Sequence, residues 1–160
     1  MGEIKLSIAD YENHSSRYVG CLILTSNHKF LLQQRGIDWE RYPAALATFG
    51  GKIELGETPE QALARELKEE LGAKIIFNHV TTLGTFIKNN DNCNEFIYGY
   101  FWHDIKNTIT GCYEGEAKYY DNYTDALQHP KILDDTRWLI NAFVNHKIDL
   151  ASAIKSAEAK

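Results

Sequence analysis

Three glutamates stand close together in a segment with the pattern of a short helix. Glu66, Glu69 and Glu70 lie within residues 50–72, which we call the glutamate segment. Positions three and four residues apart face the same side of a helix, so these carboxylates would repel one another. A hard divalent cation would convert that repulsion into binding, because Mg²⁺ takes carboxylate oxygens and keeps several of its waters. The alternative is a solvated acidic face, and residue chemistry alone leaves both interpretations open.

The helix that would carry these glutamates has recognisable ends and a side that can be buried. Thr58 suits the N-cap, Pro59 fits the first helical position, and Gly72 fits the position after the last turn. Leucines at helical spacing form one narrow stripe: Leu63, Leu67 and Leu71. The helix can therefore bury its leucines and hold the carboxylates at the edge of the core.

Strand signals precede the glutamate segment. Residues 17–24 and 29–35 are rich in β-branched and aromatic residues and predict a hairpin. Residues 36–47 are predicted to form a loop, and residues 48–51 a short extended segment that ends in a glycine turn.

Further strands and a helix follow the segment. Residues 73–88 and 95–105 are predicted strands, joined by a turn at residues 89–94. Residues 113–123 are predicted to be a loop that leads into a last strand, and residues 134–148 a closing amphipathic helix. This alternation predicts an α/β fold.

Composition and charge narrow the classes of function. The chain has 160 residues, 44% of them hydrophobic, which is enough for one core. Its formal net charge of -5 argues against a protein that binds a nucleic-acid backbone. A small anionic ligand stays open, because metal ions can supply positive charge locally. We expect one domain over residues 1–150 and a frayed tail over residues 151–160.

Cysteine usage and hydropathy favour a cytoplasmic protein. Cys21, Cys93 and Cys112 are odd in number and form no CxxC pair, which is typical of reduced thiols. The first residues lack the basic and apolar regions of a signal peptide. No apolar run approaches the ~20 residues that span a bilayer, so no membrane partner is expected.

The glutamate segment resembles the signature of the Nudix hydrolases of the MutT type. The matching positions are Gly51, Glu57, Arg65, Glu66, Leu67, Glu69, Glu70 and Gly72. Ala73 departs from the larger aliphatic residue that is usual after them. The resemblance implies an α/β/α sandwich with a mixed central sheet. It also implies Mg²⁺-dependent hydrolysis of a diphosphate bond in a nucleoside diphosphate derivative, with water attacking one phosphorus.

The same resemblance implies roles for individual residues. Glu69 and Glu70 would be the main Mg²⁺ ligands, helped by the backbone carbonyl of Gly50, and Mn²⁺ could replace Mg²⁺. Glu66 would be a further ligand or the base that accepts the proton of the attacking water.

Two pairs of residues would complete this site. Arg65 and Glu57 match a pair that orients the catalytic segment. The family usually draws another carboxylate from a loop late in the chain, where Glu114 and Glu116 stand. Either could bind a metal or act as a base, and the alternative is an ordinary polar loop.

Cations near the segment could bind the phosphates of a substrate. Lys52 directly follows the glycine turn and is the favoured candidate, with Arg35 as the second. Arg41 and Tyr42 lie in the loop that could reach the substrate, although a surface role is favoured for both.

The substrate is narrowed by what the sequence lacks. The turn at residues 48–51 has no proline, unlike that of the coenzyme A branch of the family. The ADP-ribose branch has a proline some sixteen residues after the segment, where this chain has Asn89. The dinucleoside polyphosphate branch prefers a tyrosine in the same region, and this chain has none there. Nucleoside triphosphates and nucleotide sugars remain. The Phe-Gly-Gly-Lys turn resembles the enzymes that cleave triphosphates to a monophosphate and pyrophosphate.

Two aspartates suggest how a base could be recognised. Asp134 and Asp135, with Trp138 after them, are similar to a segment that reads the purine edge in a family branch that cleaves oxidised purine triphosphates. The asparagine that assists there corresponds to Ala47 here. The alternative is that either aspartate is the N-cap of the closing helix.

A different class of function is a catalytically silent Nudix domain that senses a nucleotide. Such domains usually lose a metal-binding glutamate, and this chain keeps all three. Either way the expected partner is a small nucleotide, and a homodimer is left open because many family members dimerise.

Overall fold

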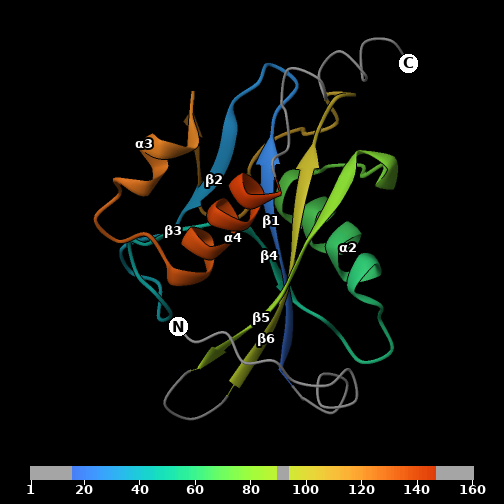
Figure 1. Cartoon of the computed structure of the whole chain (residues 1–160), viewed down its shortest axis with the longest axis horizontal. Helices are drawn as coiled ribbons and strands as arrows, with labels where there is room; N and C mark the ends of the chain where they lie inside the picture. Colours follow the sequence, from blue (N-terminus) through green and yellow to red (C-terminus); the bar gives the residue numbers. More distant parts are fainter. Residues whose placement is uncertain (1–15, 90–93, 147–160) are drawn as a thin grey trace.

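The computed structural model describes residues 16–89 and 94–146, and in this part of the chain a mixed sheet of seven strands forms the centre (Figure 1). The strands are β1 (Arg17–Leu24), β2 (Phe30–Gln34), β3 (Leu46–Ala47), β4 (Phe49–Lys52), β5 (Val80–Asn89), β6 (Asn94–His103) and β7 (Glu116–Tyr120). Five of them lie in the order β3-β2-β1-β6-β5, while β4 pairs with β1 and β7 pairs with β2. β1 and β6 run parallel, and the other strand pairs run antiparallel.

Helices cover both faces of this sheet. The helices are α2 (Pro59–Leu71), the 3₁₀ turn η1 (Phe77–His79), α3 (Tyr123–Leu127) and α4 (Asp134–Asn145). Alternate residues of β1 point to opposite faces, so Cys21 and Ile23 join the core under α2, whereas Leu22 and Leu24 join the core under α4. Figure 1 shows α2 and α4 separated by the central strands. This is the α/β/α sandwich expected from the sequence.

The ends of α2 are the ones that the sequence predicts. The hydroxyl of Thr58 accepts the N–H of Gln61, and the Gln61 side chain accepts the N–H of Thr58, which makes a capping box. Gly72 ends the helix in the left-handed region at φ 63°. The leucine stripe is fully buried, as predicted, at Leu63, Leu67 and Leu71.

Three strands include residues that the sequence predicts as loop or turn: β3 at the end of the loop 36–47, β4 at the glycine turn that ends the extended segment 48–51, and β7 in the loop 113–123. Residues 49–52 form β4, because the glycines of this segment pair with β1 at Gly20↔Gly50 and Val19↔Gly51. Residues 116–120, predicted as part of a loop, form β7, whose pairing with β2 is long-range and leaves no local signal. After β7 the chain enters helix α3 and not a further strand.

Other boundaries moved by a few residues. The strand predicted from residue 73 begins only at Val80, because the 3₁₀ turn η1 precedes it. The closing helix ends at Asn145, and residues 147–160 lie outside the described residues. Part of the predicted turn at 89–94 lies outside them too. The expected domain limits, residues 1–150 with a frayed tail, stay a prediction.

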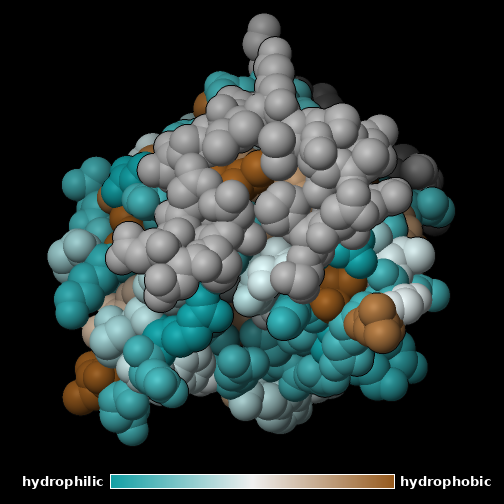
Figure 2. Space-filling model, turned by 90° about the horizontal axis from the view of Figure 1, so that it is seen from below, coloured by the Kyte–Doolittle hydropathy of each residue, from teal (hydrophilic) through white to brown (hydrophobic). Residues whose placement is uncertain are grey.

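The visible surface is mostly polar, and the described cysteines are free thiols. Seen from below, its coloured surface is mostly hydrophilic, and hydrophobic residues appear as small separate patches (Figure 2). Cys21 is buried and Cys112 half-buried, and both are free thiols; Cys93 lies outside the described residues. In the described ranges, none of the helices has the length and apolar character to cross a membrane. The cytoplasmic location and the homodimer stay predictions.

Candidate metal and nucleotide site

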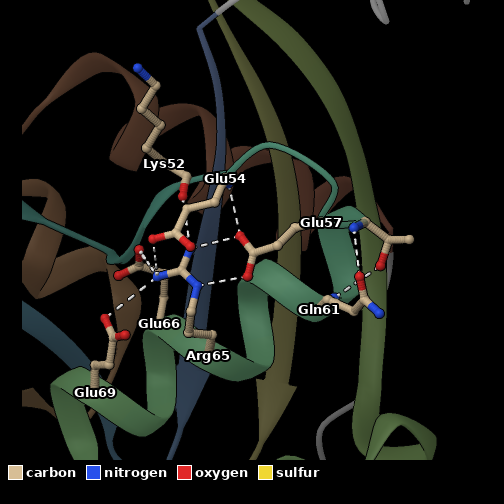
Figure 3. Close-up of polar contacts among 8 residues, drawn as sticks. Lys52, Glu54, Glu57, Gln61, Arg65, Glu66 and Glu69 are labelled. Atoms are coloured by element: carbon tan, nitrogen blue, oxygen red, sulfur yellow. Dashed lines mark hydrogen bonds and ion pairs between the residues drawn. The ribbon is translucent and has the colours of Figure 1, made fainter.

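Arg65 binds the loop before α2 to the helix itself. Its guanidinium donates to both carboxylate oxygens of Glu57 at 2.7 and 2.8 Å and to the carbonyl of Lys52 at 2.9 Å. It also donates to Glu66 at 2.8 Å and lies 3.5 Å from Glu69 (Figure 3). The hydrogen bonds from Arg65 lower the pKa of Glu57 to about 2. Arg65 and Glu57 are therefore brought together as the sequence predicts.

Among the residues that the structure describes, no cation pairs with the buried carboxyl group of Glu70. The residue is 2% exposed, and its Oε1 accepts the backbone N–H of Gly50 at 3.0 Å. The amide of Gln33 lies 3.5 Å from its other oxygen, and Glu114 is close enough to hydrogen-bond it. Burial, with the charges of Glu114 and Glu66, raises the pKa of Glu70 to about 9.

The Glu66 carboxylate occupies the space beside Gly51 that a larger residue's Cβ would fill. A Cβ built on Gly51 would stand 2.6 Å from Oε2 of Glu66, closer than atoms can pack. Burial raises the pKa of Glu66, while its hydrogen bond from Arg65 lowers it. Glu69, with its side chain 60% exposed, lies on the open side of the helix. Gly51 is thus part of the cradle for the Glu66 carboxylate.

The two late glutamates have different surroundings. Glu114 lines the same cleft as Glu70 and Gly50 and raises the pKa of Glu70 by its charge. Its backbone carbonyl accepts the amide of Gln33 at 3.0 Å, which fixes the loop before β7 against β2. Glu116 begins β7 and lines a separate hollow with Trp39. Of the two, Glu114 is the one placed beside the glutamate segment.

A divalent cation suits this group of acids. Within the described ranges, no three Asp, Glu, His or Cys side chains already converge as a ready metal cluster. Glu66 and Glu69 turn toward Arg65 instead, so the arginine takes the position of a counter-ion. Glu70 has only neutral donors and acidic neighbours. Hard carboxylate oxygens around a buried acid without a counter-charge are the donors that Mg²⁺ prefers.

A cleft of about 230 Å³ opens beside these acids. Its walls come from β1, β2, β4, the loop between β2 and β3, and the start of α4. Arg35 lines this cleft, and among its charged neighbours the nearby Glu114 has the strongest effect on its pKa. Lys52 does not line it: its side chain points away from the carboxylates in Figure 3, and only its carbonyl faces Arg65. The geometry thus favours Arg35, where the sequence favoured Lys52.

The two aspartates of α4 are not its N-cap. Leu133 is the cap residue, without a side-chain hydrogen bond, and Asp134 and Asp135 occupy the first turn. The capping alternative is therefore wrong for both. Asp135 accepts the backbone N–H of Thr136 at 3.1 Å and lines the cleft, whereas Asp134 is exposed and outside its lining. Ala47 also lines the cleft.

Sequence reasoning missed residues at the other side of the cleft. Arg41 and Tyr42, for which a surface role was favoured, line it together with Tyr18 and Glu95. Arg41 donates to Oε1 of Glu95 at 2.7 Å, although 54 residues separate them. Gln33 was missed as well. A polar residue at a strand position that ought to be buried was the one available signal for Gln33 and Glu95.

Comparison with known families gives one match over most of the chain. The family model with the description NUDIX domain matches residues 14–140 of this chain. The match includes the glutamate segment, the strands on both sides of it and the first half of α4.

Curated relatives match over a shorter stretch. The nucleoside triphosphatase NudI of Enterobacter sp. (strain 638) is 41% identical over 59 residues, 37% of this chain and 42% of that protein. NudI of Escherichia fergusonii is 37% identical over 65 residues, 41% of this chain and 46% of that protein. The chain thus spans less than half the length of these relatives.

Solved structures are similar over nearly the whole described fold. The MutT protein from Methanosarcina mazei Go1 has a TM-score of 0.69 at 18% identity, covering 84% of this chain and 96% of that one. The NUDIX domain of Shewanella oneidensis NrtR, solved in complex with ADP ribose, has a TM-score of 0.63 at 20% identity, covering 88% and 99%. At these identities the likeness shows the fold, and the predicted α/β/α sandwich is confirmed.

Proposed function

The chain belongs to the NUDIX domain family, and we propose that it hydrolyses a nucleoside triphosphate to the monophosphate and pyrophosphate. The main support for this proposal is the position of Glu70. It is buried beside Glu66 and Glu114 at a cleft, and no cation of the described residues pairs with it. The names of the relatives that match part of the chain support a triphosphate over a nucleotide sugar.

The metal expected of this family is Mg²⁺, for which Mn²⁺ can substitute. The residues that would hold it are Glu69, Glu70 and Glu114, with the carbonyl of Gly50, whereas Glu66 is assigned to the base and not to the metal. When bound, a divalent metal neutralises phosphate charge and makes a coordinated water more acidic.

Glu66 is our candidate for the general base. Its half-buried carboxylate has a raised pKa, which makes it a better proton acceptor than an ordinary surface glutamate. The oxygen of water bonds to the α- or the β-phosphorus, one of its protons passes to the Glu66 carboxylate, and the bond from that phosphorus to the α,β-bridging oxygen breaks, which releases the monophosphate and pyrophosphate. Arg65 holds the carboxylate in place at 2.8 Å, and Glu57 holds Arg65.

The cleft supplies groups for the rest of the nucleotide. Arg35 lines the cleft near Glu114, and we assign it to the phosphates, toward which its remaining N–H groups would donate. Asp135 offers a carboxylate acceptor at the start of α4, and we assign it, not Asp134, to the base. An oxidised purine stays within this proposal, as Asp135 could accept its ring N–H groups.

Formation of the nucleoside monophosphate from a panel of nucleoside triphosphates and nucleotide sugars, separated by chromatography, tests the proposal with and without Mg²⁺. Running the reaction in ¹⁸O water shows which bond breaks, because the label must appear in the monophosphate or pyrophosphate. Label in orthophosphate alone would identify a γ-phosphatase and overturn the proposal.

The variant Glu70→Gln should lose at least ~10²-fold in turnover, because an amide keeps the volume and removes the ligand charge. The matched control is Glu60→Gln on the exposed first turn of the same helix, which should keep its turnover. Tight nucleotide binding by the wild type without any hydrolysis would instead favour a silent sensing domain.

A further inference from the structure

The cleft extends along the sheet beyond the acids that would bind metal. Gly50 pairs with Gly20 of β1, whereas Glu95 precedes Phe96, which pairs with Arg17. Glu95 therefore lies four residues further along the strands, or ~13 Å at the rise of a β-strand. The cleft thus has one end at the acids and another at Glu95.

At this second end an ion pair with Glu95 holds the side chain of Arg41. The carboxylate of Glu95 is 8% exposed and bonds Arg41 at 2.7 Å, while the Arg41 side chain is 54% exposed. Glu95 first, and Tyr18 second, raise the pKa of this guanidinium, so Tyr18 lies beside it as well. Because a guanidinium carries five N–H donors, some of them stay available toward the cleft after these two contacts.

The loop that carries Arg41 is itself held in an unusual shape. Arg35 donates to the carbonyl of Arg41 at 2.6 Å and to that of Tyr42 at 3.1 Å, and its guanidinium stacks on the Trp39 ring at 4.4 Å. Tyr42 and Ala44 take positive φ values of 49° and 59°. Left-handed backbone at residues other than glycine costs energy and is often kept at functional sites.

We propose that Arg41, positioned by Glu95, contacts the base of a nucleotide bound in the cleft and selects bases that present a carbonyl group over bases that present an amino group. The inference rests on the proposed function and deepens it, because it names the class of base. Arg41 reads the base, and Glu95 acts through Arg41 as a positioning residue.

Hydrogen-bond chemistry sets the direction of this preference. Arginine can only donate, so a carbonyl oxygen is satisfied and an amino group meets another donor. A good arginine contact to a base edge contributes roughly 1–3 kcal/mol of discrimination, which corresponds to about 5- to 150-fold in an affinity ratio.

Two pairs of substrates carry that difference, together with a ring N–H beside the carbonyl that the amino member lacks, so the loss of the preference in Arg41→Lys is what assigns it to Arg41. Inosine and adenosine triphosphates differ at carbon 6, and uridine and cytidine triphosphates at carbon 4, as carbonyl against amino group. In at least one pair we expect kcat/KM to favour the carbonyl member by about 10-fold or more. Arg41→Lys and Glu95→Gln should each reduce that ratio below about 3-fold, because lysine cannot match the planar fork and glutamine loses the ion pair.

Controls separate base reading from stability. Arg137→Lys, an exposed arginine of α4 outside the cleft, should leave the ratio unchanged. Ribose 5-triphosphate has no base, so Arg41→Lys should leave its KM unchanged. A wild-type ratio near one in both pairs would overturn the proposal. So would an Arg41→Lys enzyme that keeps the ratio, whatever its melting temperature.

Failure of the proposed function would be visible separately. If no triphosphate is hydrolysed, calorimetric Kd values for α,β-methylene analogues of the same four nucleotides replace kcat/KM. The carbonyl preference and its loss in Arg41→Lys are then expected in binding, and equal Kd values within both pairs would overturn the assignment of Arg41.

Discussion

Without metal, the buried acid Glu70 should make the protein less stable as pH rises. Its pKa is about 9 in the folded state and 4.5 as the ordinary value, so folding takes up a proton between these pH values. Each pH unit in that window lowers the free energy of unfolding by up to about 1.4 kcal/mol. From pH 5 to pH 7 the decrease should approach about 3 kcal/mol, and below pH 4.5 this contribution vanishes.

Urea denaturation in a chelating buffer at pH 5, 6 and 7 measures this slope. In Glu70→Gln the decrease of the free energy of unfolding with pH should largely disappear. At pH 7 without metal this variant should be more stable than the wild type. Glu60→Gln is the matched control and should keep the wild-type slope, because Glu60 is exposed. Saturating Mg²⁺ should flatten the wild-type slope by favouring ionised Glu70. Equal slopes in wild type and Glu70→Gln would refute the reasoning.

Three further changes test the supports of the site. Gly51→Ala should lower kcat while circular dichroism stays unchanged, because the new Cβ displaces the Glu66 carboxylate that serves as the base. Thr58→Ala should lower the free energy of unfolding in urea by about 1 kcal/mol and keep turnover, because it removes only the cap of α2. Arg65→Lys should raise the pKa of Glu57 from about 2 toward its ordinary value, as followed by carboxyl-carbon NMR; an unchanged pKa would exclude Arg65 as its cause.

Local patterns were enough to predict the helix of the glutamate segment. The cap at Thr58, the glycine at Gly72 and the buried leucine stripe all depend on neighbours within a few turns. The pairing of Arg65 with Glu57 was predicted from the family resemblance. In the structure Nε of Arg65 donates to Oε2 of Glu57 at 2.7 Å. Short-range spacing therefore predicted the helix, and the family resemblance predicted the contact between Arg65 and Glu57.

The opposite side of the cleft could not be predicted in the same way. β7 is a strand because it pairs with β2, some 85 residues earlier, and this pairing decides that Glu114 and not Glu116 faces Glu70. Arg41 and Glu95 meet only after the loop folds back over the sheet. The local sequence pattern around β7 or around Arg41 does not predict these long-range contacts. Only the tertiary structure distinguishes a surface arginine from one that lines a cleft.

The acidic helix also shows where folding and function conflict. Arg65 offsets the charges of Glu57, Glu66 and Glu69, so these acids are compatible with a stable metal-free fold. Glu70 has no such partner: neutral donors and the acidic Glu114 surround it. A chain selected for stability alone would have a neutral residue of similar volume here, because without metal the buried carboxyl group must take up a proton on folding above pH 4.5. Its retention is therefore best explained by a cation that binds the folded state and supplies the missing charge.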